Sequence, residues 1–300
     1  MTLLLVTRKR LEASERRDRS WPHGRKHGAG LRKRDPGLRR ASAGFARRAA
    51  RVALDAAVDG LKHPRMEVRS DFRRREVVYT PDLPWSPSPS PGVDRRMLDR
   101  VGDEVARATS IVRYAPESRF AAHRHDLGEE FLVLEGMFSD EHGDYPRGSY
   151  VRNPPGSSHS PFTIDGCTIF VKLRQFHPED QTSVRIETRD APCVPGAVPG
   201  LSVRPLHEFR GENVALVRWE PGTEFHPHIH MGGEEILVLD GTFSDELGDY
   251  PAGTWIRSPH ASQHRPFSRD GCLIYVKVGH LPPPTTDCAC ISRAEERRRE

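Results

Sequence analysis

The chain contains one long segment twice, and the two copies are separated by 105 residues without a gap. Residues 113–176 and 218–281 share 33 identities in 64 positions. Chance does not produce this agreement, and the spacing is far longer than the roughly 20–50-residue periods of solenoid repeats. The sequence therefore predicts two tandem copies of a whole domain.

Each copy carries the local signals of short β-strands. Glu130–Leu134 is a β-rich run that ends near Gly136, and residues 143–146 (GDYP) have the composition of a turn. Cys167–Leu173 is rich in β-branched and aromatic residues, as strands are. Many short strands separated by turns, with no long helical period, predict an all-β sandwich or barrel.

The domain borders follow from a lead-in that precedes each copy. Pro91–Gly92–Val93 resembles Pro199–Gly200–Leu201, so we predict a first domain over 66–178 and a second over 179–281. The linker 85–92 (WSPSPSPG) is stiffened by its prolines, and we expect it to lie along the barrel. Residues 282–300 are predicted to be a disordered tail.

Charge is distributed very unevenly along the chain. Residues 1–65 hold 18 Lys and Arg against 6 Asp and Glu, so this segment carries +12 and the remainder, given the total of +4, carries −8. We predict that residues 1–65 are a disordered basic extension, or a non-native one with Met66 as the true start. A basic arm for nucleic acid or acidic lipid and a partner-binding helix over 41–61 are the alternatives. The acidic remainder disfavours nucleic acid as a partner of the core.

Two further features bear on the compartment. No apolar run approaches the roughly 18 residues of a membrane span, and the opening MTLLLV precedes its positive charges, unlike a secretory signal. Five scattered cysteines do not suggest a disulfide framework. We therefore expect a cytoplasmic protein with no membrane partner, in which Cys167 and Cys272 are buried thiols.

Both copies repeat a set of metal-ligand residue types at the same spacing. In an H-x-H pattern the two imidazoles point to one face of a strand, because side chains alternate with period two. A glutamate four residues later keeps that parity, and a further histidine returns after a hairpin. Three imidazoles and one carboxylate are ligands for a divalent ion and leave one or two positions for water or substrate. The candidate ligands are His123, His125, Glu129 and His159 in the first copy, and His228, His230, Glu234 and His264 in the second.

These residues resemble the two motifs of the cupin superfamily. The second copy matches the first motif from Gly222 to Gly241, whereas the first copy has Glu117 in place of the leading glycine. In the second motif the final asparagine is replaced by Thr163 and Ser268. The strings GEEFLVLEGMFSDEHGDYPRGSYVRNPPGSSH and CTIFVKLRQF resemble, more narrowly, the cupin domain of the ChrR family.

The resemblance implies two jelly-roll β-barrels, each with one divalent ion, which would be Zn, Fe(II) or Mn(II). It implies a metal-dependent sensor, regulator or small-molecule-binding module; the alternative is an Fe- or Mn-dependent dioxygenase acting on a small carbonyl or hydroxyaryl ketone. A sigma factor is a disfavoured partner, because the zinc-binding anti-sigma domain needs cysteines and residues 1–118 contain none. A homodimer stays open, and no catalytic acid or base is assigned.

Other polar residues are interpreted as structural. Glu130 and Glu235 have the opposite strand parity to the ligand glutamates and are expected to face outward or to be structural. The duplicated Ser–Asp pairs 139–140 and 244–245 are expected to cap hairpins. The duplicated arginines are expected to form ion pairs, and the unduplicated histidines to lie at the surface. These arginines are Arg113, Arg152, Arg218 and Arg257, and these histidines are His142, His207, His226 and His260.

Overall fold

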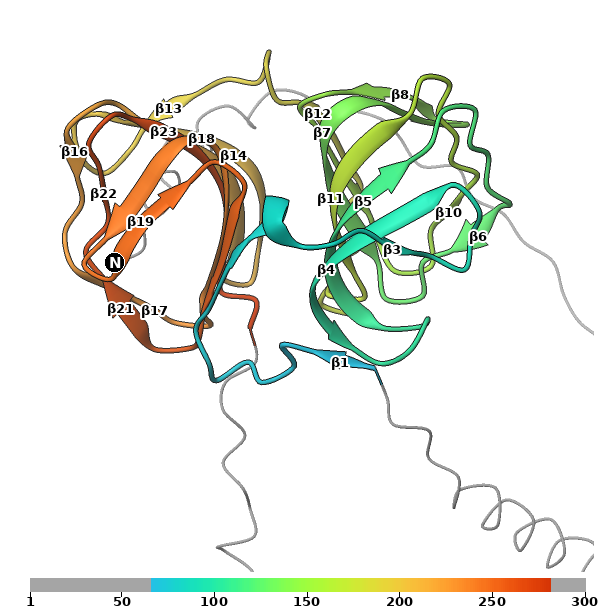
Figure 1. Cartoon of the computed structure of the whole chain (residues 1–300). Helices are drawn as coiled ribbons and strands as arrows, with labels where there is room; N and C mark the ends of the chain where they lie inside the picture. Colours follow the sequence, from blue (N-terminus) through green and yellow to red (C-terminus); the bar gives the residue numbers. More distant parts are fainter. Residues whose placement is uncertain (1–65, 282–300) are drawn as a thin grey trace, which may run out of the picture. The chain divides into compact units, whose positions relative to one another are not determined.

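The computed structural model describes residues 66–281. The predictions for residues 1–65 and 282–300 lie outside this part of the chain. Over the described residues the secondary structure is β apart from one turn of 3₁₀ helix, η1 (Thr80–Asp82), which confirms the predicted all-β class. Figure 1 shows two sheet-rich barrels that follow one another along the sequence.

The first barrel is built around a sheet with the order β1-β4-β5-β11-β7-β9-β12. The hairpin strands β3 and β8 pair with β4 and β7, and β6 pairs with β10 as a separate two-stranded sheet. The strands are β1 (Glu67–Val68), β3 (Ser86–Pro87), β4 (Val93–Val101), β5 (Arg107–Tyr114), β6 (His123–Arg124), β7 (Glu129–Asp140), β8 (Gly143–Pro146), β9 (Ser149–Asn153), β10 (Ser158–His159), β11 (Cys167–Leu173) and β12 (Val184–Glu187).

The second barrel repeats this arrangement with the order β13-β14-β15-β23-β18-β20-β2. Here β19 pairs with β18, β22 pairs with both β16 and β18, and β17 pairs with β21. The strands are β2 (Glu76–Tyr79), β13 (Val194–Pro195), β14 (Leu201–Phe209), β15 (Glu212–Trp219), β16 (Thr223–Glu224), β17 (His228–His230), β18 (Glu234–Asp245), β19 (Gly248–Pro251), β20 (Thr254–Ser258), β21 (Ser262–His264), β22 (Phe267–Ser268) and β23 (Cys272–Val278).

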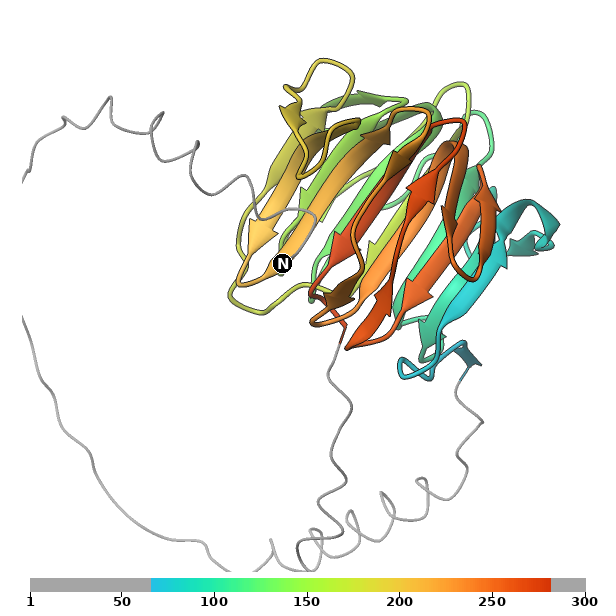
Figure 2. The ribbon, with the colours of Figure 1, turned by 90° about the vertical axis from the view of Figure 1, so that its left-hand side faces the viewer.

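The barrels exchange their leading strands. β2 lies between β1 and β3 of the first barrel in sequence but pairs with β20 of the second, with Val78 opposite Trp255. β12 precedes the second barrel but pairs with β9 of the first, with Ile186 opposite Tyr150. Figure 2 shows the early blue segment beside the orange strands of the second barrel. Each sheet is therefore completed by backbone hydrogen bonds from the other repeat, which couples the two repeats in folding.

Three apolar clusters account for the core. One fills the first barrel around Phe131, Val151 and Ile169, and another fills the second around Trp219 and Ile236. The third cluster contains residues of both repeats, including the large, fully buried side chains of Tyr150, Trp255 and Tyr275. Its buried members are Val78, Leu98, Ile111, Leu132, Tyr150, Phe170, Leu206, Val214, Leu216, Leu237, Trp255 and Tyr275. Burial at about 25 cal/mol per Å² of apolar surface makes this shared cluster a major source of stability.

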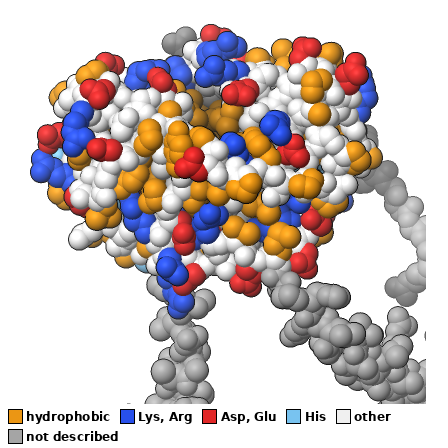
Figure 3. All heavy atoms as spheres, in the orientation of Figure 1, with side chains coloured by type: hydrophobic (Ala, Val, Ile, Leu, Met, Phe, Trp, Pro, Cys, Tyr) orange, Lys and Arg blue, Asp and Glu red, His pale blue; other side chains and the backbone are white. Residues whose placement is uncertain are grey.

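The linker prediction is confirmed, since Ser86–Pro87 of the proline-rich segment pairs with β4 as strand β3. Among residues 66–281, no helix has the length and apolar character that crossing a membrane requires. On the face drawn in Figure 3, acidic and basic side chains are interspersed over both barrels.

Candidate metal centres

The first barrel brings its three predicted histidine ligands together, and Glu129 lies beside two of them. β10 pairs with β6 so that His159 lies opposite His123, and His125 follows directly after β6. Glu129 begins β7, and its Oε2 lies 3.3 Å from His125 Nε2 and 3.5 Å from His159 Nε2. The ligand nitrogens of the three histidines all lie within 4.8 Å of one another.

The second barrel repeats this geometry on β17, β18 and β21. His228 lies opposite His264, and Glu234 Oε2 lies 3.5 Å from both His230 Nε2 and His264 Nε2. All four ligand atoms lie within 4.8 Å of one another. The Nε2 atoms of His228 and His230 are 3.0 Å apart. Two such nitrogens face each other comfortably only when a proton or a cation lies between them.

These separations fit ligands of a shared ion. Ligand atoms at about 2.0–2.2 Å from a metal, at tetrahedral or octahedral angles, are about 3.0–3.5 Å apart. Four buried polar atoms that point into the two centres have no hydrogen-bond partner. These atoms are Nε2 of His125, His159 and His264, and Oε2 of Glu234. Buried polar atoms are normally satisfied, so this convergence of orphaned ligand atoms indicates room for a cation in each centre.

Neighbouring acceptors fix which nitrogen points inward. Asp140 accepts from His159 Nδ1 at 3.0 Å, and Asp245 lies 3.4 Å from His264 Nδ1. Main-chain carbonyl oxygens hold Nδ1 of His123 and His228 at 3.1 and 3.0 Å. A proton held on Nδ1 leaves Nε2 as the free lone pair that coordinates a metal.

The Ser–Asp pairs thus do more than the sequence predicted. Asp140 caps its turn, as expected, by accepting from the backbone N–H of His142 at 2.8 Å. Its carboxylate also accepts from Tyr145 Oη and orients the ligand His159. The exact repetition of Ser–Asp in both copies was the available signal, but sequence spacing does not reveal the second contact.

Burial favours the neutral, metal-binding form of three of the candidate ligands, His125, His228 and His230. Burial lowers the pKa of His125 and His228, and it lowers the pKa of His230 to about 4. Burial acts in the same direction on His159 and His264, but hydrogen bonds to Asp140 and Asp245 and the nearby ligand glutamates raise the pKa of both. Neutral imidazoles are the form that a metal requires.

The two centres differ in access. His123 is exposed at the mouth of the first barrel, whereas its counterpart His228 is only 8% exposed. A cavity of about 500 Å³ adjoins the first centre and is lined by His123, His125 and His159 together with apolar residues such as Phe138. In the second barrel Trp219 replaces Tyr114 and is 2% exposed.

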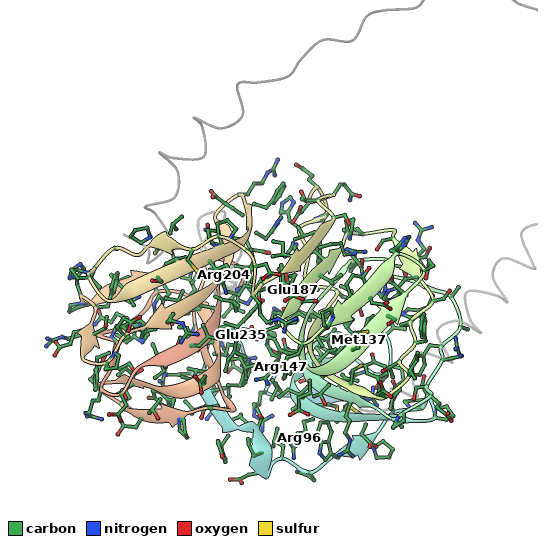
Figure 4. All side chains as sticks on the ribbon, turned by 90° about the horizontal axis from the view of Figure 1, so that it is seen from above. Arg96, Met137, Arg147, Glu187, Arg204 and Glu235 are labelled. Carbon is green, nitrogen blue, oxygen red and sulfur yellow. The ribbon has the colours of Figure 1, made fainter. Side chains whose placement is uncertain are left out.

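Glu130 and Glu235 point away from the metal centres, as their parity predicts, but they are not exposed. Lys172 of the first barrel contacts Glu235 of the second at 2.6 Å, and Lys277 of the second contacts Glu130 of the first. All four side chains are at most 1% exposed. Figure 4 labels Glu235 between the two barrels. The structural interpretation is correct, and the expectation of an outward-facing position is wrong because the other repeat covers this face.

The duplicated arginines divide into buried and exposed pairs. Arg152 and Arg257 are fully buried, and they bind Glu130 and Asp99 respectively, which confirms the ion-pair prediction for them. Arg113 forms an exposed pair with Asp94 at 2.8 Å. No ion pair of Arg218 is found among residues 66–281.

His207 corrects a prediction. It was expected at the surface, but its side chain is 4% exposed and its Nε2 donates to Asp180 at 2.7 Å. Asp180, His207 and Glu212 lie close enough together to resemble a third metal site. However, Arg152 already binds both carboxylates, at 2.7 Å and 3.1 Å, so their charge is balanced. We interpret this group as part of the buried ion-pair network.

The thiols behave as predicted. Cys167 and Cys272 are free and buried, and burial raises the pKa of each to about 11, which disfavours the reactive thiolate.

Comparison with solved structures shows the same fold in proteins of low identity. A "putative dioxygenase" from Nostoc punctiforme superposes with a TM-score of 0.60 at 15% identity, over 72% of this chain and 85% of that one. A "putative glyoxylate induced protein" from Pseudomonas aeruginosa gives 0.58 at 14% identity, over 75% and 96%. Protein Ylba from E. coli gives 0.55 at 16% identity, over 75% and 98%. The search of curated proteins found no match.

The family comparison agrees with the two-barrel fold and the repeated ligand set. The profile of the ChrR cupin-like domain matches the chain twice, over residues 73–177 and 181–282. The protein therefore belongs to the family of ChrR cupin-like domain proteins, and it carries that domain in two copies.

Proposed function

We propose that each barrel binds one divalent metal ion, and that the ion in the first barrel binds a small molecule from solution. The second centre, enclosed by its core, holds its ion mainly for stability. The observation that carries this proposal is the contrast between two centres with the same ligands and different access. A metal with open coordination positions acts on a ligand only where that ligand reaches it.

The ligands of the first centre face a cavity large enough for a small metabolite. Its volume of about 500 Å³ lies within the range of about 300–1,000 Å³ of small-molecule sites. Three imidazoles and Glu129 leave one or two positions on the ion, and the exposed edge of His123 lies on the open side. A bound ion there supplies Lewis acidity or redox chemistry, while His159 and Asp140 hold the ligand geometry.

The test uses Co(II), whose visible spectrum reports its coordination. Metal-free protein is loaded with Co(II) and titrated with azide, a small anion that fills open positions. In His230→Ala only the first centre remains, and we expect azide to change its spectrum. In His125→Ala only the second remains, and we expect a much weaker response. A stronger response in His125→Ala, or no Co(II) uptake by either variant, would overturn the proposal.

An enzymatic role is the second candidate, favoured by the same cavity beside the ligands. The likeness to a "putative dioxygenase" supports only the shared fold, since the identity is 15%. Iron-loaded protein incubated with β-diketones or hydroxyaryl ketones provides the test. Oxygen uptake that is lost in His125→Ala and kept in His230→Ala would support this candidate, whereas no uptake would count against it.

A regulatory role, a sigma-factor partner, a homodimer and a cytoplasmic location stay predictions. Pull-down from the native cytosol tests the partner, and recovery of no regulator would count against the sensor hypothesis. Sedimentation of the metal-loaded protein tests the dimer.

A further inference from the structure

The cavity of the first barrel contains an arginine that the second barrel lacks. Arg95 lies on β4 opposite Val112, which belongs to the interior cluster of the first barrel. The equivalent register in the second barrel places Val203 opposite Val217, and both are buried in its core. The side chain of Arg95 therefore enters the barrel interior, where it lines the same cavity as the candidate metal ligands.

This guanidinium is mostly removed from water. The side chain of Arg95 is 14% exposed, and its Nε is buried without a hydrogen-bond partner. Its other two nitrogens donate to the carboxylate of Glu104 at 3.1 and 3.4 Å. A buried cation requires an anionic partner, and here that partner is a carboxylate.

Glu104 reaches this position from a loop that is specific to the first barrel. Residues 102–106 connect β4 to β5, whereas the connection between β14 and β15 has only residues 210 and 211. The three additional residues account for the change in offset between the repeats, from 108 in the lead-in to 105 afterwards. Glu104 is 52% exposed, so it leaves Arg95 for solvent at little cost.

We propose that the first barrel binds a small carboxylic acid, whose carboxylate replaces that of Glu104 on Arg95. This inference rests on the proposed function, because the same molecule extends from Arg95 toward the metal centre. The cavity is also lined by Val112, Phe138 and Val171, so a carboxylic acid with an apolar or aromatic body suits it. Arg95 selects an anion, and Glu104 occupies the position until the ligand arrives.

The test compares benzoate with benzamide, its neutral isostere, by calorimetric titration of the Zn(II)-loaded full-length protein. We expect benzoate to bind and Arg95→Val, which introduces the residue of the second barrel, to weaken it by about tenfold or more. Arg95→Lys should retain part of the affinity. Glu104→Gln removes the competing carboxylate and should strengthen benzoate binding several-fold. Benzamide binding should not change in any variant.

Several outcomes would contradict this inference. It is wrong if benzoate does not bind the wild type, if Arg95→Val binds it as tightly, or if Glu104→Gln weakens it. Metal content and the azide response of Co(II) are measured in the same variants. If the metal content and the azide response persist while benzoate binding does not follow the expected pattern, the carboxylate inference is wrong and the proposed metal-centred function is still supported. If both are absent in the wild type, the proposed function itself falls.

Discussion

The two barrels carry the same candidate metal ligands in different interiors. The second barrel fills its mouth with apolar side chains, since Phe225 is 3% exposed and Val198 packs on its core. At the equivalent positions of the first barrel, Phe120 is partly exposed and Ser90 lines the cavity. Duplication has therefore preserved the candidate ligands in both copies, while the exposure of the two centres has diverged. The ligand motif alone does not distinguish a closed centre from an open one.

The interface between the barrels differs in a second way, in how each buried glutamate is compensated. Glu130 contacts two cations, Lys277 and Arg152. Glu235 contacts one lysine, Lys172, together with the neutral Trp255 Nε1 and the imidazole of His280. The Lys172–Glu235 and Lys277–Glu130 pairs should therefore lose different amounts of stability when the lysine is replaced.

The largest expected effect is that of Lys172→Met. It leaves the fully buried Glu235 without its lysine, and breaking such a pair costs about 3–5 kcal/mol of unfolding free energy. The matched variant Lys277→Met leaves Glu130 with Arg152 and should cost only about 1–3 kcal/mol. Urea unfolding of both variants at a fixed metal content measures the difference. Equal costs would show that the two buried pairs are energetically equivalent, and a larger cost for Lys277→Met would contradict the prediction.

A smaller effect is expected from acid. Burial lowers the pKa of His280 to about 4, whereas free imidazole titrates near 6.5. Between these values the unfolded chain binds a proton that the folded chain does not, so stability falls as the pH drops from about 6.5 to about 4. The contribution is about 3 kcal/mol.

The first barrel provides the control for this pH effect. Gln175 stands at the position equivalent to His280 and does not titrate. His280→Gln should therefore reduce the stability that the metal-free protein loses between pH 6.5 and 4, while His230, whose pKa is also about 4, keeps its own contribution. If the variant loses as much stability as the wild type over that interval, His280 is not the responsible group.

The smallest expected effect distinguishes the two centres through their supporting aspartates. Asp140→Asn removes the charged partner of His159 and should lower metal affinity about 10–100-fold, since outer-shell partners have effects of this size. Asp245→Asn should cost less, because that aspartate lies 3.4 Å from its histidine rather than 3.0 Å. Zinc titration of each variant, with the other centre removed by His230→Ala or His125→Ala, provides the comparison. A larger loss for Asp245→Asn would contradict it.

Much of the fold was predictable because its signals are local and repeated. The short strands, the turns and the two H-x-H patterns all depend on neighbours within a few residues. Because the segment is repeated after 105 residues, each of these signals occurs twice in the chain. The eight candidate ligands could be named for the same reason, and the structure places them in two groups.

The remaining features depend on contacts between distant residues. Strand parity shows that Glu235 points away from its centre, but it does not show that the other barrel covers that face. The exchange of β2 and β12 is a long-range pairing without a sequence signature. The three additional residues of the β4–β5 loop also shift the alignment, so Arg95 is not seen beside Val203 until the strand registers are known.

The most direct test of the account is the metal content of the purified chain and of its two single-site variants. We expect up to two divalent ions per chain after reconstitution, with one lost in His125→Ala and the other lost in His230→Ala. The closed second centre should release its ion to chelator more slowly than the first. A protein that binds no metal after reconstitution, or that loses both ions or neither with a single substitution, would contradict the claim that each barrel holds its own ion.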